Sequence, residues 1–155
     1  MSFVLNKLDD KLIKANLLNQ KNCIIVQQVN CQGVMGKGLA LSIRNKYPKV
    51  YTKYKALCNS KSSNELLGGV LYVTDKNVVI ANIFGQNGYG HGCKYTDYFA
   101  LKRGLEHIAV VSKQTNLPVY LPYKIGCGLA GGDWNKVQDI IKSTMTDVDY
   151  YVCQL

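Results

Sequence analysis

The sequence contains no apolar run close to the roughly 20 residues of a membrane-spanning helix. Its N-terminus carries Asp9 and Asp10 and shows no signal-peptide pattern. The six cysteines form no CxxC pair, and the spacing of His91 and Cys93 does not fit a zinc site. We therefore expect no membrane contact, no metal and no cofactor, and a cytoplasmic protein whose reduced thiols pack as small apolar side chains.

Acidic residues are scarce, with 10 against 19 basic ones, so the formal net charge is +9. This surplus favours an anionic partner, either nucleic acid or a phosphorylated small molecule. The basic residues form no single block, and the densest stretch, 44–55, is interpreted as an exposed helical face. Nucleic acid therefore stays an alternative that we do not favour. The length of 155 residues predicts a single domain, 1–155, which we expect to be a monomer.

Apolar periodicity predicts strands that alternate with helices. The expected strands cover residues 11–18, 22–30, 66–74, 78–84, 117–121 and 149–155. The expected helices cover 36–47 and 50–58, and two more follow caps at Thr96 and Asp133. Because a hairpin turn at 75–77 interrupts the alternation, the pattern predicts an α/β fold, a three-layer α/β/α domain with a mixed central sheet of about six strands.

Two glycine-rich loops each follow a strand and precede a helix. The first holds Gly33, Gly36 and Gly38, and the second spans residues 126–132 with four glycines. Helix N-termini offer unpaired amides to anions, and glycine lets the backbone approach a phosphate closely. The first loop fits neither the P-loop nor the G-x-G-x-x-G spacing. We therefore expect a general phosphate cradle, with both loops facing one cleft beyond the carboxyl ends of the strands.

The stretches NCQGVMGKGLA (30–40) and IGCGLAGGDW (125–134), with the segment 84–98, resemble the macrodomain family, which binds ADP-ribose. The resemblance covers nearly the whole chain. It is strongest to the branch of ADP-ribose 1''-phosphate phosphatases, terminal ADP-ribose–protein glycohydrolases and antitoxins that remove ADP-ribose from DNA. The fold that it implies is the three-layer macrodomain, in agreement with the alternation of strands and helices.

The resemblance also implies ligand contacts. Asn16 stands where macrodomains usually have an acid that holds the adenine amino group, Asn30 faces the distal ribose, and Phe84 and Tyr89 close over the distal end. The first loop wraps that ribose and the neighbouring phosphate, and the second holds the diphosphate through backbone amides. The implied ligand-binding residues are Asn16, Leu17, Asn30, Gly33, Val34, Met35, Gly36, Lys37, Gly38, Phe84, Tyr89, Gly126, Cys127, Gly128, Leu129, Ala130 and Gly131.

Two departures bear on the chemistry. The glycohydrolases of this branch use a lysine just after the strand that ends near Phe84, where this chain has Gly85 and Gln86. They also use an aspartate where this chain has Ala130. A lysine-adduct mechanism needs an amine and an assisting acid, so phosphate-ester hydrolysis fits better. An anion cradle with Lys37 or Lys94 and an activated water suffices for that reaction.

The expected catalytic residues are Asp133, Asn30 and His91. Asp133 is either the base or only the cap of the last helix, and His91 is either a loop residue or a donor to the terminal phosphate. The first hypothesis is an ADP-ribose-binding hydrolase of ADP-ribose 1''-phosphate. The alternatives are a non-catalytic binder of ADP-ribose or a related signalling nucleotide, and a hydrolase that removes ADP-ribose from protein or nucleic acid.

Overall fold

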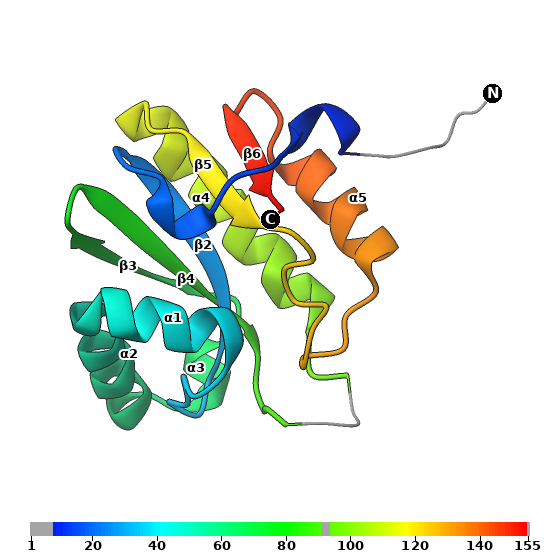
Figure 1. Ribbon diagram of the computed structural model, residues 1–155. Coiled ribbons are helices and arrows are strands. Elements are labelled where there is room, and N and C mark those ends of the chain that lie inside the picture. The colour runs from blue at the N-terminus through cyan, green and yellow to red at the C-terminus, as the bar shows by residue number, and fades with distance from the viewer. Residues whose placement is uncertain (1–7, 91–93, 155) are drawn as a thin grey trace.

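The computed structural model describes residues 8–90 and 94–154, which form one six-stranded sheet between two layers of helices (Figure 1). The strand order is β1-β6-β5-β2-β4-β3, and every neighbouring pair is parallel except β3 and β4. The strands are β1 (Leu12–Ile13), β2 (Cys23–Asn30), β3 (Val70–Asp75), β4 (Val78–Gln86), β5 (Val119–Pro122) and β6 (Tyr150–Cys153). The expected mixed sheet of about six strands and the three-layer α/β/α class are confirmed.

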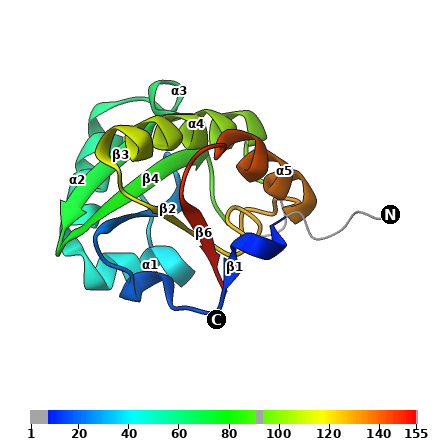
Figure 2. The same ribbon diagram turned by 90° about the horizontal axis from the view of Figure 1, so that it is seen from above.

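Two hydrophobic cores lie on opposite faces of this sheet. Helices α4 (Tyr98–Thr115) and α5 (Trp134–Thr144) cover one face, where Leu101, Leu105 and Val137 are fully buried. Helices α1 (Gly38–Lys46), α2 (Pro48–Ser60) and the short α3 (Ser63–Leu66) pack on the other core. Figure 2 shows the sheet between α1 on one side and α4 and α5 on the other. Because β2 lies in the centre and is covered on both faces, its apolar run has no alternation.

The hairpin is confirmed. Asp75 pairs with Val78, and the two residues between them, Lys76 and Asn77, both have positive φ, at 48° and 67°. Two left-handed residues in a two-residue loop match the right-handed twist of the strands.

Four local predictions are wrong. The first strand is only Leu12–Ile13, because the chain then turns into a 3-10 helix, Leu17–Asn19, which the side chain of Asn16 caps. The polar stretch 60–63, whose composition predicts a loop, runs into α3, which begins at a Ser62–Glu65 capping box. The third strand begins at Val70, not at residue 66.

The cap of α4 is Asp97, whose carboxylate accepts a hydrogen bond from the Ala100 N–H, and not Thr96. Thr96 is buried and bonds elsewhere, as described below. The cap of α5 is Asp133, as expected. In the described part of the chain, no helix is both long and apolar enough to cross a membrane.

Candidate functional site

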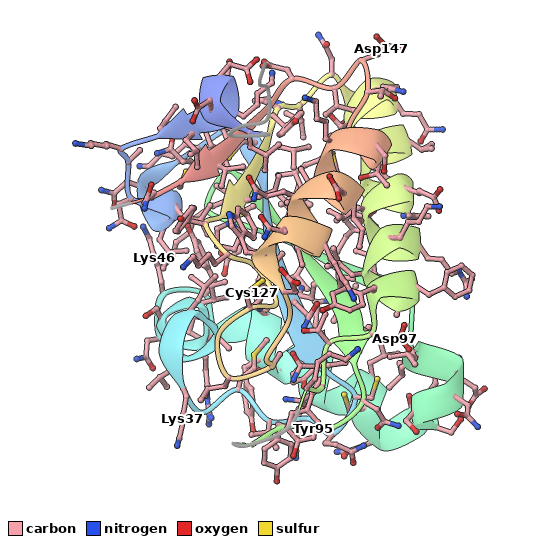
Figure 3. The ribbon with its side chains drawn as sticks, turned by 90° about the vertical axis from the view of Figure 1, so that its right-hand side faces the viewer. Lys37, Lys46, Tyr95, Asp97, Cys127 and Asp147 are labelled. Carbon is pink, nitrogen blue, oxygen red and sulfur yellow. The ribbon has the colours of Figure 1, made fainter. Side chains whose placement is uncertain are left out.

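A cleft of about 630 Å³ opens at the carboxyl ends of β2, β4 and β5. Its two walls are the glycine loops, which the sequence places far apart and the sheet brings together. The implied residues that line it are Asn30, Val34, Gly36, Lys37, Gly38, Tyr89, Gly126, Gly128, Leu129 and Ala130. Figure 3 shows Lys37 and Tyr95 at the end of the molecule opposite Asp147.

A second hollow of about 540 Å³ adjoins this cleft. Asn16 and Leu17 line it, and Leu39, Pro122 and Tyr123 line both spaces. The Asn16 side-chain oxygen accepts a hydrogen bond from the Leu18 N–H at 3.0 Å, which fixes the side chain at the hollow.

Asn30 shapes the first loop from the end of β2. Its Oδ1 accepts hydrogen bonds from the N–H groups of Gln32 (2.9 Å) and Val34 (3.3 Å), and its Nδ2 donates to the Val34 carbonyl at 2.8 Å. The hydroxyl of Tyr54, a fully buried residue of α2, lies 2.7 Å from the Asn30 carbonyl and 2.8 Å from Oδ1. Burial raises the Tyr54 pKa, so the phenol keeps the proton that it shares between these two acceptors.

The first wall presents unpaired backbone donors. Helix α1 begins at Gly38, and the N–H groups of Gly36, Lys37 and Gly38 have no hydrogen-bond acceptor within residues 8–90 and 94–154. The helix dipole adds partial positive charge at the same place. This geometry suits an anion that is held by main-chain amides.

The second wall has the same property. The N–H groups of Gly128, Leu129 and Ala130 find no partner in the part of the chain that the structure describes. The loop itself is held by other amides: Gly131 donates to the Gly128 carbonyl and Gly132 to the Gly126 carbonyl. The residues that carry these two sets of N–H groups, which have no partner among the described residues, therefore line one cleft.

Other implied residues lie elsewhere. Met35 and Phe84 are each 1% exposed in the core, where the Phe84 ring stacks on Tyr54, and Gly33 packs against Lys55. Cys127 and Gly131 are not among the residues that line the cleft. His91 lies outside the described residues. Their contacts with a ligand stay predictions.

Asp133 also lies outside the residues that line the cleft. Its carboxylate accepts a hydrogen bond from the Asn135 N–H at 2.9 Å, and its own N–H donates to the Tyr98 hydroxyl. In the described chain, the cleft is lined by no carboxylate and no imidazole. Three or more potential metal ligands gather nowhere in residues 8–90 and 94–154.

The thiols near the site are protonated at neutral pH. Burial raises the Cys127 pKa to about 11, and the nearby Asp133 carboxylate adds to the shift. Burial raises the pKa of Cys31, which follows Asn30, to about 11 as well. Because the thiolate is the reactive form, neither cysteine is a ready nucleophile.

Sequence reasoning missed the polar floor of the cleft. Gln27, Gln28 and Gln86 line it, and Gln27 donates from Nε2 to the Asn82 Oδ1 at 2.7 Å. The available signal was a Gln27-Gln28 pair inside an otherwise apolar strand that is buried on both faces. Buried amides need partners, so such a pair indicates a polar network.

The profile of the Macro domain matches residues 26–141. The chain belongs to the Macro domain family. The match spans both glycine loops and all the strands between them, which are the elements that build the cleft.

Two relatives and a solved structure place this macrodomain among known proteins. A "DNA ADP-ribosyl glycohydrolase" of Mycobacterium tuberculosis is 28% identical over 139 residues, 86% of this chain but only 39% of the relative. This macrodomain therefore spans about two fifths of that relative's length. An "ADP-ribose 1''-phosphate phosphatase" of Scheffersomyces stipitis is 26% identical over 83% of this chain and 87% of the relative. A macrodomain protein from Streptomyces coelicolor has a TM-score of 0.78 at 26% identity, over 94% and 98% of the two chains.

Proposed function

We propose that the cleft binds ADP-ribose or a small derivative of it. The observation that carries the proposal is the pair of facing walls, in which Gly36–Gly38 and Gly128–Ala130 offer free N–H groups. The diphosphate lies between these walls. The adenine extends into the adjoining hollow at Asn16, and the distal ribose lies near Asn30. The net charge of +9 raises the local concentration of such an anion.

The reaction that we propose is hydrolysis of ADP-ribose 1''-phosphate to ADP-ribose and phosphate. The phosphatase relative matches this chain over most of both lengths, which supports a shared reaction class. Main-chain donors aimed at developing negative charge stabilise a phosphoryl-transfer transition state. Asp133 acts as the base only if its carboxylate leaves the cap of α5, and His91 is the other candidate.

A non-catalytic binder is the second candidate, and the lining of the cleft favours it. Among the described lining residues, none is an acid or a histidine that could activate water. A site of this composition binds an anionic nucleotide without accelerating its hydrolysis by general-base catalysis.

Removal of ADP-ribose from protein or nucleic acid has less support. A side chain at position 85 would place its Cβ 2.4 Å from Oε1 of Gln28, so a lysine there would require the Gln28 side chain to move. At position 86 the Gln86 side-chain amide already has two hydrogen-bond partners: its Oε1 accepts from Gln28, and its Nε2 donates to the Gly88 carbonyl. Neither Gly85 nor Gln86 supplies the amine that this mechanism uses.

The test is calorimetry with ADP-ribose, followed by a phosphate-release assay on the 1''-phosphate. Binding together with phosphate release supports the hydrolase. Tight binding with no release at high enzyme concentration assigns the non-catalytic role. Absence of binding would remove ADP-ribose as the ligand of the cleft.

A further inference from the structure

Gln28 joins three segments that surround the cleft. From the central strand β2, its Nε2 donates to Oε1 of Gln86 at 2.8 Å and to Oγ1 of Thr96 at 2.9 Å. Gln86 ends β4, and Thr96 precedes α4 and forms an isolated bridge with Gln86. From the sequence, no role was assigned to Gln28, and Thr96 was expected only as a helix cap.

Thr96 carries the connection on to the second glycine loop. Its hydroxyl lies 2.6 Å from the Gly126 carbonyl, which can only accept, so the hydroxyl proton points to that carbonyl. Toward Gln28 the same hydroxyl must then be the acceptor. The NH2 group of the Gln28 amide must therefore face Thr96. Both hydrogen bonds then run in the same direction: Gln28 donates to Thr96, and Thr96 donates to Gly126.

The two carbonyls that flank the free amides of the second loop are both bonded to the Tyr95–Thr96 segment. The Gly126 carbonyl accepts from the Thr96 hydroxyl and from the Gly132 N–H at 2.9 Å. The Ala130 carbonyl accepts from the N–H groups of Tyr95 (2.6 Å) and Thr96 (3.1 Å). In Figure 3, Tyr95, Asp97 and Cys127 mark these two neighbouring loops. Thr96 is only 2% exposed, so its bond to Gly126 lies inside the protein.

The Gln28 amide packs closely against glycine residues. A Cβ on Gly85 would lie 2.4 Å from Oε1 of Gln28, and one on Gly126 would lie 3.0 Å from the same oxygen. A Cβ on Gly132 would lie 2.6 Å from the Gly126 carbonyl oxygen. Gly85 of β4 and the glycines of the second loop therefore accommodate the Gln28 amide and the bond between Thr96 and Gly126.

We propose that Gln28 is a positioning residue for anion binding, acting through Thr96. The pair holds the Gly126 carbonyl inward, so that the second loop turns its N–H groups at residues 128–130 to the diphosphate. A carbonyl that faced the cleft would place partial negative charge against the phosphate and remove part of the cradle. This inference rests on the proposed binding of ADP-ribose in the cleft.

The main test is Thr96→Val, which keeps the shape of the side chain and removes the hydroxyl. The affinity for ADP-ribose falls at least ~10-fold by calorimetry, and Thr96→Ser restores it because serine keeps the donor. The control is Thr144→Val in α5. Thr144 is also buried, its hydroxyl donates to the Ile140 carbonyl at 2.8 Å, and it does not line the cleft. This control loses stability but keeps its affinity.

Amide NMR separates positioning from general destabilisation. In the wild type, ADP-ribose shifts the N–H signals of both walls. In Thr96→Val the shifts at residues 128–130 shrink, while those at 36–38 remain. Equal affinity and equal shifts in wild type and Thr96→Val would overturn the inference and leave the binding function standing.

Gln28→Met provides the same test from the other end of the connection, in case Thr96→Val does not fold. Its affinity also falls, because Thr96 and Gln86 lose their shared donor. Wild-type affinity in a folded Gln28→Met protein would overturn the inference. Failure of the wild type to bind ADP-ribose overturns the inference together with the proposed function.

Discussion

Individual glycines decide how closely a ligand can approach the walls of this cleft. A Cβ added at Gly36 or Gly128 meets no atom within 4 Å, and neither residue has a positive φ. Both positions line the cleft. A side chain there enters the open space and leaves the protein around it undisturbed.

Gly36→Val and Gly128→Val should therefore fold normally and bind poorly. The added methyl groups occupy the path of the phosphates, so the ADP-ribose affinity falls at least ~10-fold, about 1.4 kcal/mol. Calorimetry measures the affinity, and thermal unfolding checks the fold. Gly36→Ala should give a smaller loss of affinity, and Asn45→Val, at an exposed position of the following helix α1, should give none. Unchanged affinity in Gly36→Val would remove the first loop from the site.

Asn16 tests where the adenine lies. Asn16→Asp should tighten ADP-ribose binding by a modest factor, because a carboxylate accepts a hydrogen bond about twice as strongly as a neutral amide oxygen. One carboxylate oxygen still caps Leu18, and the other is free for the base. Asn19→Asp adds the same charge three residues away and should change the affinity little. Weaker binding by Asn16→Asp would indicate that the base is held elsewhere.

Among the elements, α5 depends on its N-cap residue, Asp133, for stability, and our catalytic proposal gives the same residue a chemical role. Asp133 caps the helix through the Asn135 N–H, and Cys127 lies close enough for the carboxylate to raise its pKa. Replacing a cap by alanine typically costs about 1 kcal/mol, whereas serine can still cap.

Asp133→Ala and Asp133→Ser separate these two roles. We expect alanine to lower the free energy of unfolding in urea by about 1 kcal/mol and serine to keep it near the wild-type value. Both variants should bind ADP-ribose within a few-fold of the wild type. If Asp133 is also the base, phosphate release falls by roughly 10²–10⁴ in both, since serine cannot replace a carboxylate as a base. Normal turnover by Asp133→Ser would leave Asp133 as a cap and direct attention to His91.

Elements with a strong local signal could be predicted from the sequence. The apolar run before Asn30 gave β2, and the 75–77 turn gave the hairpin, because both signals are confined to a few residues. The short first strand could not be predicted, because its length depends on pairing with β6 at the far end of the chain. Thr96 was misassigned as the helix cap because threonine and aspartate are both common N-cap residues. Only the hydrogen bond from the Thr96 hydroxyl to the distant Gly126 carbonyl leaves Asp97 as the cap.

The site could be predicted in part because its glycine loops are also local signals. A glycine loop between a strand and a helix indicates an anion-binding site, and ten of the implied residues line the cleft. Phe84 looked like a closing side chain, but the strand continues to Gln86 and buries its ring. The network of Gln28, Gln86 and Thr96 depends on contacts between residues 58 and 68 positions apart, which no local pattern contains.

Across the whole molecule, ionisation of buried thiols and phenols limits stability in alkali. Burial raises the pKa of Cys23, Cys31 and Cys127 from 9.0 to about 11, and for Cys23 the neighbouring Cys153 adds to the shift. Burial raises the Tyr72 pKa in the same direction. The folded state therefore favours the protonated form of each group more than the unfolded chain does.

Below pH 9.0 these groups should not change the free energy of unfolding. As the pH rises from 9.0 toward about 11, their ionisation should lower it. The sign follows because the unfolded chain loses these protons first and is stabilised by doing so. Urea unfolding at a series of pH values under reducing conditions measures the fall. Cys31→Ala should make the fall shallower. A stability that rises through this range would show that the thiols are not shielded from solvent.

The strand order also sets a sequence of events during protein synthesis. The β3–β4 hairpin joins neighbouring residues, but β2 pairs with β5 across Ile24 and Val119, and β1 pairs with β6 across Leu12 and Val152. Non-local pairings form late because long loops must close first. Since β6 lies between β5 and β1, a nascent chain on the ribosome holds an open β5 edge until residues 150–153 emerge. We expect a ribosome-bound chain that stops before residue 150 to need chaperone protection of that edge, and the finished chain to release it.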